Sequence, residues 1–164
     1  MLTPSDRTFS GQNSYKDGDR TVCRWYHLPY TGDYALRFRI VSTNSNHQQG
    51  IGLYFSRTEG DVFRGSLMLN GQPLPVPRKL FQHYTFKEGE IPEDGFTLSV
   101  RAEEGHLILA NESEELPGLF TSGALGCALF AEPLSDSILR FHCNDHEYDG
   151  DFDDLIFDME VFQS

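Results

Sequence analysis

The chain has 164 residues, which fits one domain that buries about 70% of its unfolded surface, enough for a core without disulfides. Hydrophobic residues make up 38% and aromatic residues 13%, a balance typical of a globular β protein and wrong for a disordered chain. The formal net charge of −12 argues against nucleic acid or an anionic membrane as the main partner, because both need a basic surface.

Five stretches alternate between apolar and polar residues, the pattern of antiparallel strands with one face in the core. Weaker strands are expected at 22–28, 62–70, 79–86, 106–111 and 125–130. About ten strands at short spacing predict an all-β, two-sheet antiparallel sandwich spanning residues 1–164 as a single domain, with a barrel as the alternative. In chain order, the predicted inward-facing residues are Tyr34, Leu36, Phe38 and Ile40; Ile51, Leu53 and Phe55; Phe96, Leu98 and Val100; Leu139, Phe141 and Cys143; and Leu155, Phe157, Met159 and Val161.

Glycine-containing turns separate these stretches. The dipeptide Asn70-Gly71 supplies two residues that tolerate positive φ, as a type I′ hairpin needs. The next segment, GQPLPVPRK, holds three prolines and is expected to form a loop or a sheet edge, because proline cannot donate to a ladder. The segment NESEELPGLF is expected to be a loop with room for one helical turn before Pro117.

The three cysteines leave at least one thiol free, and no CxxC pair suggests zinc. Cys127 and Cys143 alternate with apolar neighbours and are expected to be small core residues, although a bridge between these two stays open. The first residues, MLTPSDRTFSGQ, show no signal segment, and no stretch approaches a membrane span. We therefore expect either a cytoplasmic protein or a module cut from a larger secreted chain.

Three stretches resemble the concanavalin A-like lectin and glucanase jelly roll. GDYALRFRI is similar to the early long strand of that group, QQGIGLYFSR to the strand after it, and DFDDLIFDMEVF to its closing strand. The nearest resemblance is to laminin-G-like modules and to the bacterial sugar-hydrolase domain that acts on 3-keto-glycosides. The resemblance implies a jelly-roll sandwich that binds an oligosaccharide or polysaccharide on its concave sheet or rim loops, often with a calcium ion.

The glucanases of that group carry an E-x-D-x-x-E strand motif, which this sequence lacks. Glu112, Glu114 and Glu115 fall in the segment that we expect to be a proline-broken loop. No residue is therefore nominated as catalytic, and no nucleophile elbow or phosphate-binding glycine loop occurs. The six histidines show no zinc spacing.

The acidic segment DHEYDGDFD is a candidate calcium site, because calcium prefers six to eight oxygen ligands. It is not an EF-hand, since Ile156 stands where the bidentate Glu is required. The alternative is a solvated acidic hairpin that discourages edge-to-edge aggregation. The candidate ligands are Asp149, Asp151, Asp153 and Asp154.

Residues opposite the predicted core positions form the candidate ligand-binding face. Guanidinium groups there suit a sugar with a carboxylate or many hydroxyls, because each arginine offers a fork of donors. The alternative is cross-strand ion pairing with Asp158 and Glu160. The candidate ligand-binding residues are Arg37, Arg39, Tyr54, Tyr84, Arg101, Arg140, His142 and, at a loop rim, Tyr26.

Three functions remain open. The preferred one is a noncatalytic carbohydrate-binding module. The second is a protein-interaction or structural sandwich, appended to a parent enzyme or assembled as a homo-oligomer. The third is a glycoside hydrolase whose carboxylates meet in space, with Glu59, Asp61 and Glu160 as candidates.

Overall fold

The computed structural model describes residues 14–56, 62–79, 82–121, 127–145 and 151–163, with no description of the Tyr15 side chain. Its elements are β1 (Ser14–Asp17), β2 (Arg20–Cys23), β3 (Tyr26–His27), β4 (Gly32–Thr43), β5 (Gln49–Tyr54), β6 (Arg64–Leu69), β7 (Gln72–Leu74), β8 (His83–Lys87), the 3-10 turn η2 (Glu88–Glu90), β9 (Phe96–Glu104), β10 (Ile108–Leu116), β11 (Leu119–Thr121), β12 (Ala128–Pro133), β13 (Ile138–Asn144) and β14 (Leu155–Gln163).

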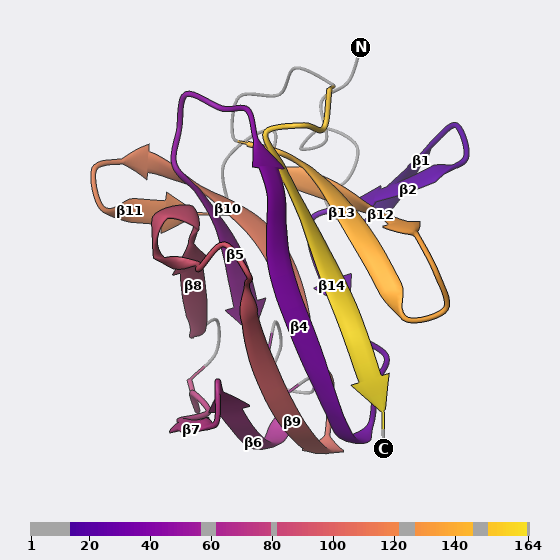
Figure 1. Cartoon of the computed structure of the whole chain (residues 1–164), viewed down its shortest axis with the longest axis vertical. Helices are drawn as coiled ribbons and strands as arrows, with labels where there is room; N and C mark the ends of the chain where they lie inside the picture. Colours follow the sequence, from indigo (N-terminus) through magenta and orange to yellow (C-terminus); the bar gives the residue numbers. More distant parts are fainter. Residues whose placement is uncertain (1–13, 57–61, 80–81, 122–126, 146–150, 164) are drawn as a thin grey trace.

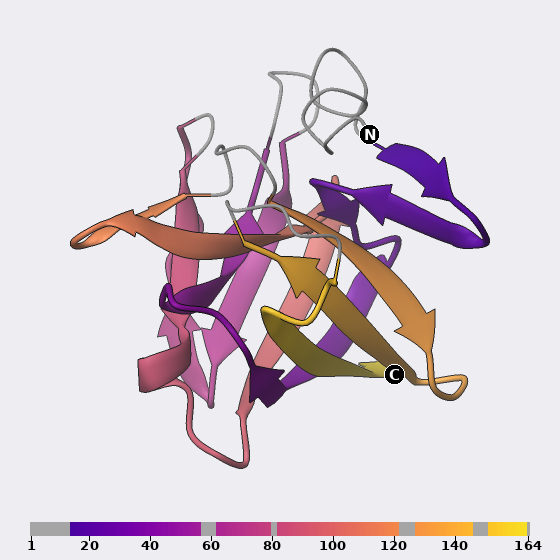
Figure 2. The same ribbon diagram turned by 90° about the horizontal axis from the view of Figure 1, so that it is seen from above.

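The strands form two antiparallel sheets packed face to face, so the predicted all-β sandwich is confirmed. Within the described residues, one sheet has nine strands in the order β1-β2-β12-β13-β14-β4-β9-β6-β7. The other has the order β11-β10-β5-β8, and β3 pairs with β10. Figure 1 shows β4, β14 and β9 in front of β10 and β5, and Figure 2 shows the β1–β2 hairpin extending away from the body of the sandwich.

The core lies between the sheets and is built by the predicted alternation. Phe38 is 1% exposed and Phe157 is fully buried, and both belong to one cluster with Leu53 and Phe55 from the opposite sheet. The closing strand β14 lies between β13 and β4, with Phe157 opposite Phe141. The two-residue alternation of apolar and polar side chains therefore correctly predicted which residues face the core. We call the face of each sheet that points away from this core its outer face.

Turn chemistry also follows the sequence. Asn70 and Gly71 have φ values of 48° and 82°, so both adopt the left-handed backbone of the predicted hairpin between β6 and β7. The proline-rich segment begins as β7 at the edge of the nine-stranded sheet and then leaves it, as predicted.

Three expectations are wrong. The segment from Glu112 to Leu116 is neither loop nor helical turn, because β10 continues to Leu116 and pairs with β11 across a turn at Pro117 and Gly118. The predicted strand 22–28 is two strands: β2 pairs with β12 in one sheet, and β3 pairs with β10 in the other. The predicted strand 79–86 begins only at His83. Pro117 misled the first prediction, and the second failed because the local pattern does not show where the chain changes sheet.

Candidate functional site

The predicted arginines gather on the outer face of the nine-stranded sheet, where they form ion pairs. Arg140 Nε and Nη2 donate to the two carboxylate oxygens of Asp158 at 2.8 and 3.0 Å. Arg39 approaches the same carboxylate at 3.6 Å from the other side. The three residues stand in one row across β13, β14 and β4, and the hydrogen bond to Asp158 raises the pKa of Arg140.

The other cationic candidates on this face also have protein partners. Arg101 Nε donates to Asp33 at 3.0 Å, and Arg37 Nη2 donates to the Asp94 carbonyl at 2.8 Å. His142 contacts Glu132 at 3.1 Å and stacks on Phe130. This arrangement is the cross-strand ion pairing that the sequence left as the alternative. A role of these residues in ligand binding stays a prediction.

Two further candidate tyrosines, Tyr84 and the predicted loop-rim residue Tyr26, pack toward the core. Tyr84 meets Phe55 edge to face, and its hydroxyl donates to the Pro75 carbonyl at 2.5 Å. Tyr26 meets Phe141 edge to face, with ring centroids 5.0 Å apart, and burial raises its pKa. Tyr26 is half-buried and lines a cleft described below, so it is the predicted ligand residue with the most suitable surroundings.

Tyr54 was expected on an exposed face, and this expectation is wrong, because its side chain is only 5% exposed. It lies on the outer face of the five-stranded sheet, where its hydroxyl donates to Glu112 Oε2 at 2.9 Å. Thr85 donates to Glu112 Oε1 at 2.6 Å, and His83 Nε2 stands 3.1 Å from Oε2. Glu112 is fully buried. A carboxylate in such a position needs several partners, because burial without them costs several kcal/mol, about 3 or more.

Two glycines of β5 make room for this carboxylate. Gly50 pairs with Glu112 and Gly52 pairs with Ala110 across the β5–β10 ladder. A Cβ at Gly52 would stand 2.8 Å from Glu112 Oε1 and 2.9 Å from the Tyr54 ring. The Glu112 side chain therefore occupies the volume that any larger residue at position 52 would fill, and from there it reaches Tyr54, Thr85 and His83.

The aromatic rings beside Glu112 form a continuous row. His83 and Tyr54 face each other across β5 and β8 and stack with centroids 4.1 Å apart. Trp25 meets Tyr54 edge to face at 4.8 Å. Glu112 thus holds Tyr54 through a hydrogen bond, and Tyr54 in turn packs against the Trp25 ring.

The sequence reasoning missed Glu112 as a site residue. Its signal was present: Ile108, Ala110 and Glu112 alternate with the core residues Leu107 and Leu109. Pro117 led the segment to be treated as a loop. The paired glycines in QQGIGLYF give a second signal, because two small residues on one strand face leave space for a neighbouring side chain.

The acidic segment near the C-terminus has a structural role at its last residue. Asp154 is buried and accepts the backbone N–H of Asp145 at 2.9 Å, while Asp145 accepts the Ser45 hydroxyl at 2.5 Å. Asp153 accepts the Asn44 amide at 3.0 Å. Asp151 is exposed, and Asp149 lies outside the described residues. Among the described residues no three side chains form a metal-binding group, and the calcium site stays a prediction.

All three cysteines are buried and free, as expected of core residues. Burial raises the pKa of Cys23 and of Cys127 to about 12, and it raises the pKa of Cys143 well above 9.0. A thiol kept protonated in this way is a poor nucleophile, so the cysteines are not catalytic candidates. Of the hydrolase carboxylates, Glu59 and Asp61 lie outside the described residues, and Glu160 stands opposite Arg37 on the outer face of β14.

A cleft of about 690 Å³ opens where β2 and β12 part, and we call it the β2–β12 cleft. The two strands share a single pair, Leu129 with Cys23, before the chain crosses to β3 in the other sheet. The cleft combines aromatic rings with charged and polar groups. Its lining residues are Asp19, Arg20, Thr21, Cys23, Trp25, Tyr26, His27, Phe130, Ala131, Glu132 and Pro133.

Arg20 is the most constrained charged residue of this cleft. Its guanidinium lies over the rings of Phe130 and Phe152, at 4.6 and 5.3 Å from their centroids, and it pairs with Asp17 at 2.8 Å. Because a guanidinium carries five N–H donors, the pair with Asp17 leaves other donors for a ligand. The Arg24 guanidinium lies over the Trp25 ring, 5.2 Å from the ring centroid. Burial lowers the pKa of Arg24.

Fold and site together define an all-β antiparallel sandwich with a mixed aromatic and polar cleft at one sheet edge. Comparison with protein-family models, with curated proteins and with solved structures found no match to this chain. None of the described residues forms a helix with the length and hydropathy that a membrane span needs.

Proposed function

We propose that this protein is a noncatalytic carbohydrate-binding module of concanavalin A-like jelly-roll type, with the β2–β12 cleft as its sugar site. One observation carries the proposal: aromatic rings and charged side chains line the same cleft, whose volume is about 690 Å³. Sites for small ligands commonly span about 300–1,000 Å³ and combine apolar walls with a few fixed polar groups. Sugars need this combination, because their C–H faces pack on rings while their hydroxyls need donors and acceptors.

Individual residues have distinct roles in this proposal. Tyr26 is half-buried and offers ring surface, and Phe141 fixes its position. Trp25 is only 9% exposed and supports the wall of the cleft, where it contacts Tyr54. Arg20, Asp19, His27 and Glu132 are exposed and supply donors and acceptors at the mouth of the cleft. The net charge of −12 favours neutral or weakly charged glycans over polyanionic ones.

Glu112 supports binding without touching the sugar. Its two carboxylate oxygens are engaged by Tyr54, Thr85 and His83, and the residue is fully buried. This favours a positioning role, in which Glu112 holds the Tyr54 and Trp25 rings, over the role of an acid or base in hydrolysis. The binding module is for that reason preferred to the glycoside hydrolase.

Trp25 is the only tryptophan of the chain, so its fluorescence reports on the cleft alone. We expect at least one of a panel of gluco-, galacto-, manno- and uronate oligosaccharides to change Trp25 emission, with a dissociation constant of about 10 μM to 1 mM by calorimetry. Substituting Arg20→Gln or His27→Ala should weaken binding. The matched control is Arg39→Gln, which removes a charge from β4, on the outer face of the nine-stranded sheet and outside the cleft.

Three results would count against the proposal. The first is the absence of heat and of any emission change with every sugar at about 10 mM. The second is binding that Arg39→Gln weakens as much as Arg20→Gln. The third is release of reducing sugar during the titration, which would favour the hydrolase instead.

A further inference from the structure

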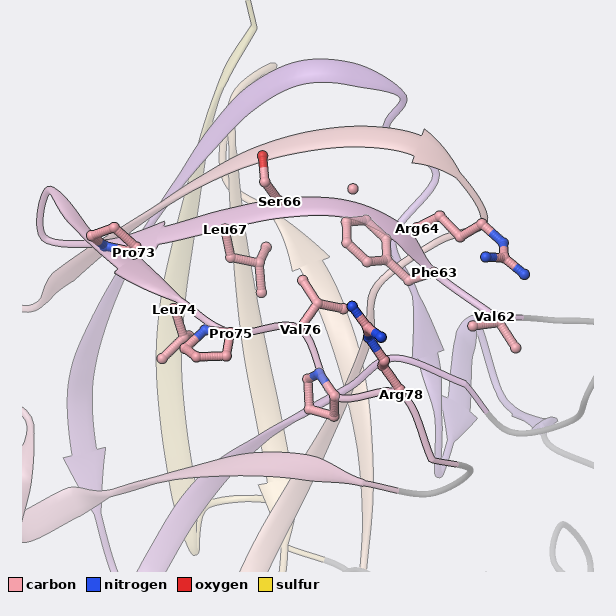
Figure 3. Close-up of a pocket in the computed structure, with 12 residues that line it drawn as sticks. Val62, Phe63, Arg64, Ser66, Leu67, Pro73, Leu74, Pro75, Val76 and Arg78 are labelled. Atoms are coloured by element: carbon pink, nitrogen blue, oxygen red, sulfur yellow. The ribbon is translucent and has the colours of Figure 1, made fainter.

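A second and larger cavity lies at the opposite edge of the nine-stranded sheet, between β6 and the segment from Pro73 to Arg78. We call it the edge pocket; its volume is about 840 Å³. Figure 3 shows the side chains of Phe63 and Leu67 on one side of the pocket. The segment that carries Pro73, Leu74, Pro75 and Val76 lies on the opposite side. None of its lining residues belongs to the β2–β12 cleft.

The sequence creates this pocket by ending a hairpin early. The β6–β7 ladder contains only three pairs, from Leu69 with Gln72 to Leu67 with Leu74. Pro73 occupies the middle pair, where an antiparallel ladder needs no N–H from that residue. Pro75 and Pro77 follow, and their rings hold φ at about −65°, far from the roughly −140° of an antiparallel strand, so the segment departs from the ladder after Leu74. The second arm therefore leaves β6, and the first residues of β6 line an open side.

Two arginines line the mouth of the pocket and differ in their partners. Arg64 pairs with Glu104 at 3.4 Å, and Figure 3 shows its side chain pointing away from the apolar wall. Arg78 is exposed, extends toward the pocket and has no acidic partner within the part of the chain that the structure describes. In a protein with 25 acidic and 13 basic residues, such a guanidinium beside an apolar cavity is a distinct feature.

We infer that the edge pocket binds a small amphipathic carboxylate, a molecule with an apolar body and one anionic end. The apolar body packs against Leu74, Val76 and the neighbouring prolines, and the carboxylate meets Arg78 in a forked, charge-assisted hydrogen bond. Sugars do not suit this pocket, because prolines and aliphatic side chains form most of its wall and Phe63 is only 2% exposed.

Decanoate is a suitable probe, and decanol is its control of equal chain length without charge. Calorimetry and backbone NMR shifts on the whole chain should show decanoate binding at the amides of residues 63–67 and 74–78, with decanol at least about tenfold weaker. Arg78→Gln should weaken decanoate about tenfold and remove the preference over decanol. Arg64→Gln, the matched control at the same mouth, should leave both affinities within about twofold.

Several results would overturn the inference. Equal losses in Arg78→Gln and Arg64→Gln would mean that general electrostatic attraction holds the anion. Decanoate shifts confined to other parts of the chain would place the site elsewhere. Binding of an extended apolar peptide, without binding of decanoate, would make the open edge of β6 a peptide site. Because Arg78→Gln changes an exposed side chain without an acidic partner, loss of folding does not obscure the test.

Discussion

On the outer face of the nine-stranded sheet, Asp158 is shared by Arg39 and Arg140, and the Arg39 side chain is 53% exposed. On the outer face of the five-stranded sheet, Glu112 is fully buried among Tyr54, Thr85 and His83. Both carboxylates occupy positions that the period of two directs away from the core. The Asp158 side chain is still 14% exposed and its arginine partners reach solvent, whereas Glu112 is held at a cost that only a set of matched donors offsets. Buried polar groups therefore identify the region built for a specific role better than charge alone does.

The largest effect is expected at Glu112. Glu112→Ala removes the carboxylate that contacts three side chains and leaves the Tyr54 and Thr85 hydroxyls without their acceptor. We therefore expect the free energy of unfolding to fall by about 3 kcal/mol. Urea denaturation at constant m-value measures the change. The control Glu115→Ala, on an exposed residue of the same strand, should cost less than about 0.5 kcal/mol. Equal losses would show that Glu112 is not the anchor of this face.

Gly52 tests the same cluster from the other side. A methyl group there would stand within 2.9 Å of both Glu112 and Tyr54, so Gly52→Ala should cost about 2 kcal/mol and move the Trp25 emission through Tyr54. Gly89→Ala is the control, because its added Cβ would meet only the flexible end of Gln48. Thermal unfolding and fluorescence measure both variants. An unchanged melting temperature and Trp25 emission in Gly52→Ala would mean that the Glu112 and Tyr54 side chains can move aside at little cost.

The buried thiols make a prediction about alkaline pH. Their folded-state pKa values lie above the unfolded value, near 12 for Cys23 and Cys127 against 9.0. The unfolded chain therefore releases these protons first, so the stability that the thiols contribute is complete below pH 9 and is lost as pH rises toward 12. Each thiol should cost about 1 kcal/mol at pH 10, and Cys127→Ala should flatten the fall in melting temperature between pH 9 and 11. A slope unchanged in that variant would contradict the assignment.

Much of the fold follows from local pattern, and much of the site does not. The inward faces of β4, β9 and β14 were readable because alternation is a property of neighbouring residues. Glu112 was misplaced because its burial depends on Gly52, Tyr54 and Thr85, which come from β5 and β8. The β2–β12 cleft was equally invisible, since it arises where one apparent strand divides between two sheets. Sites made by the pairing of distant segments have no signature within any one segment.

The smallest expected effect lies on the partly exposed outer face of the nine-stranded sheet. Arg140→Gln removes two hydrogen bonds to Asp158 but leaves Arg39 near the same carboxylate, so stability should fall by no more than about 1 kcal/mol. The loss should shrink further in about 1 M salt, because screening weakens a partly exposed pair, whereas the Glu112→Ala loss should persist. A double-mutant cycle of Arg140→Gln with Asp158→Asn measures the coupling. A coupling above about 2 kcal/mol would mean that the two outer faces hold their charges by the same means, and the contrast between them would fail.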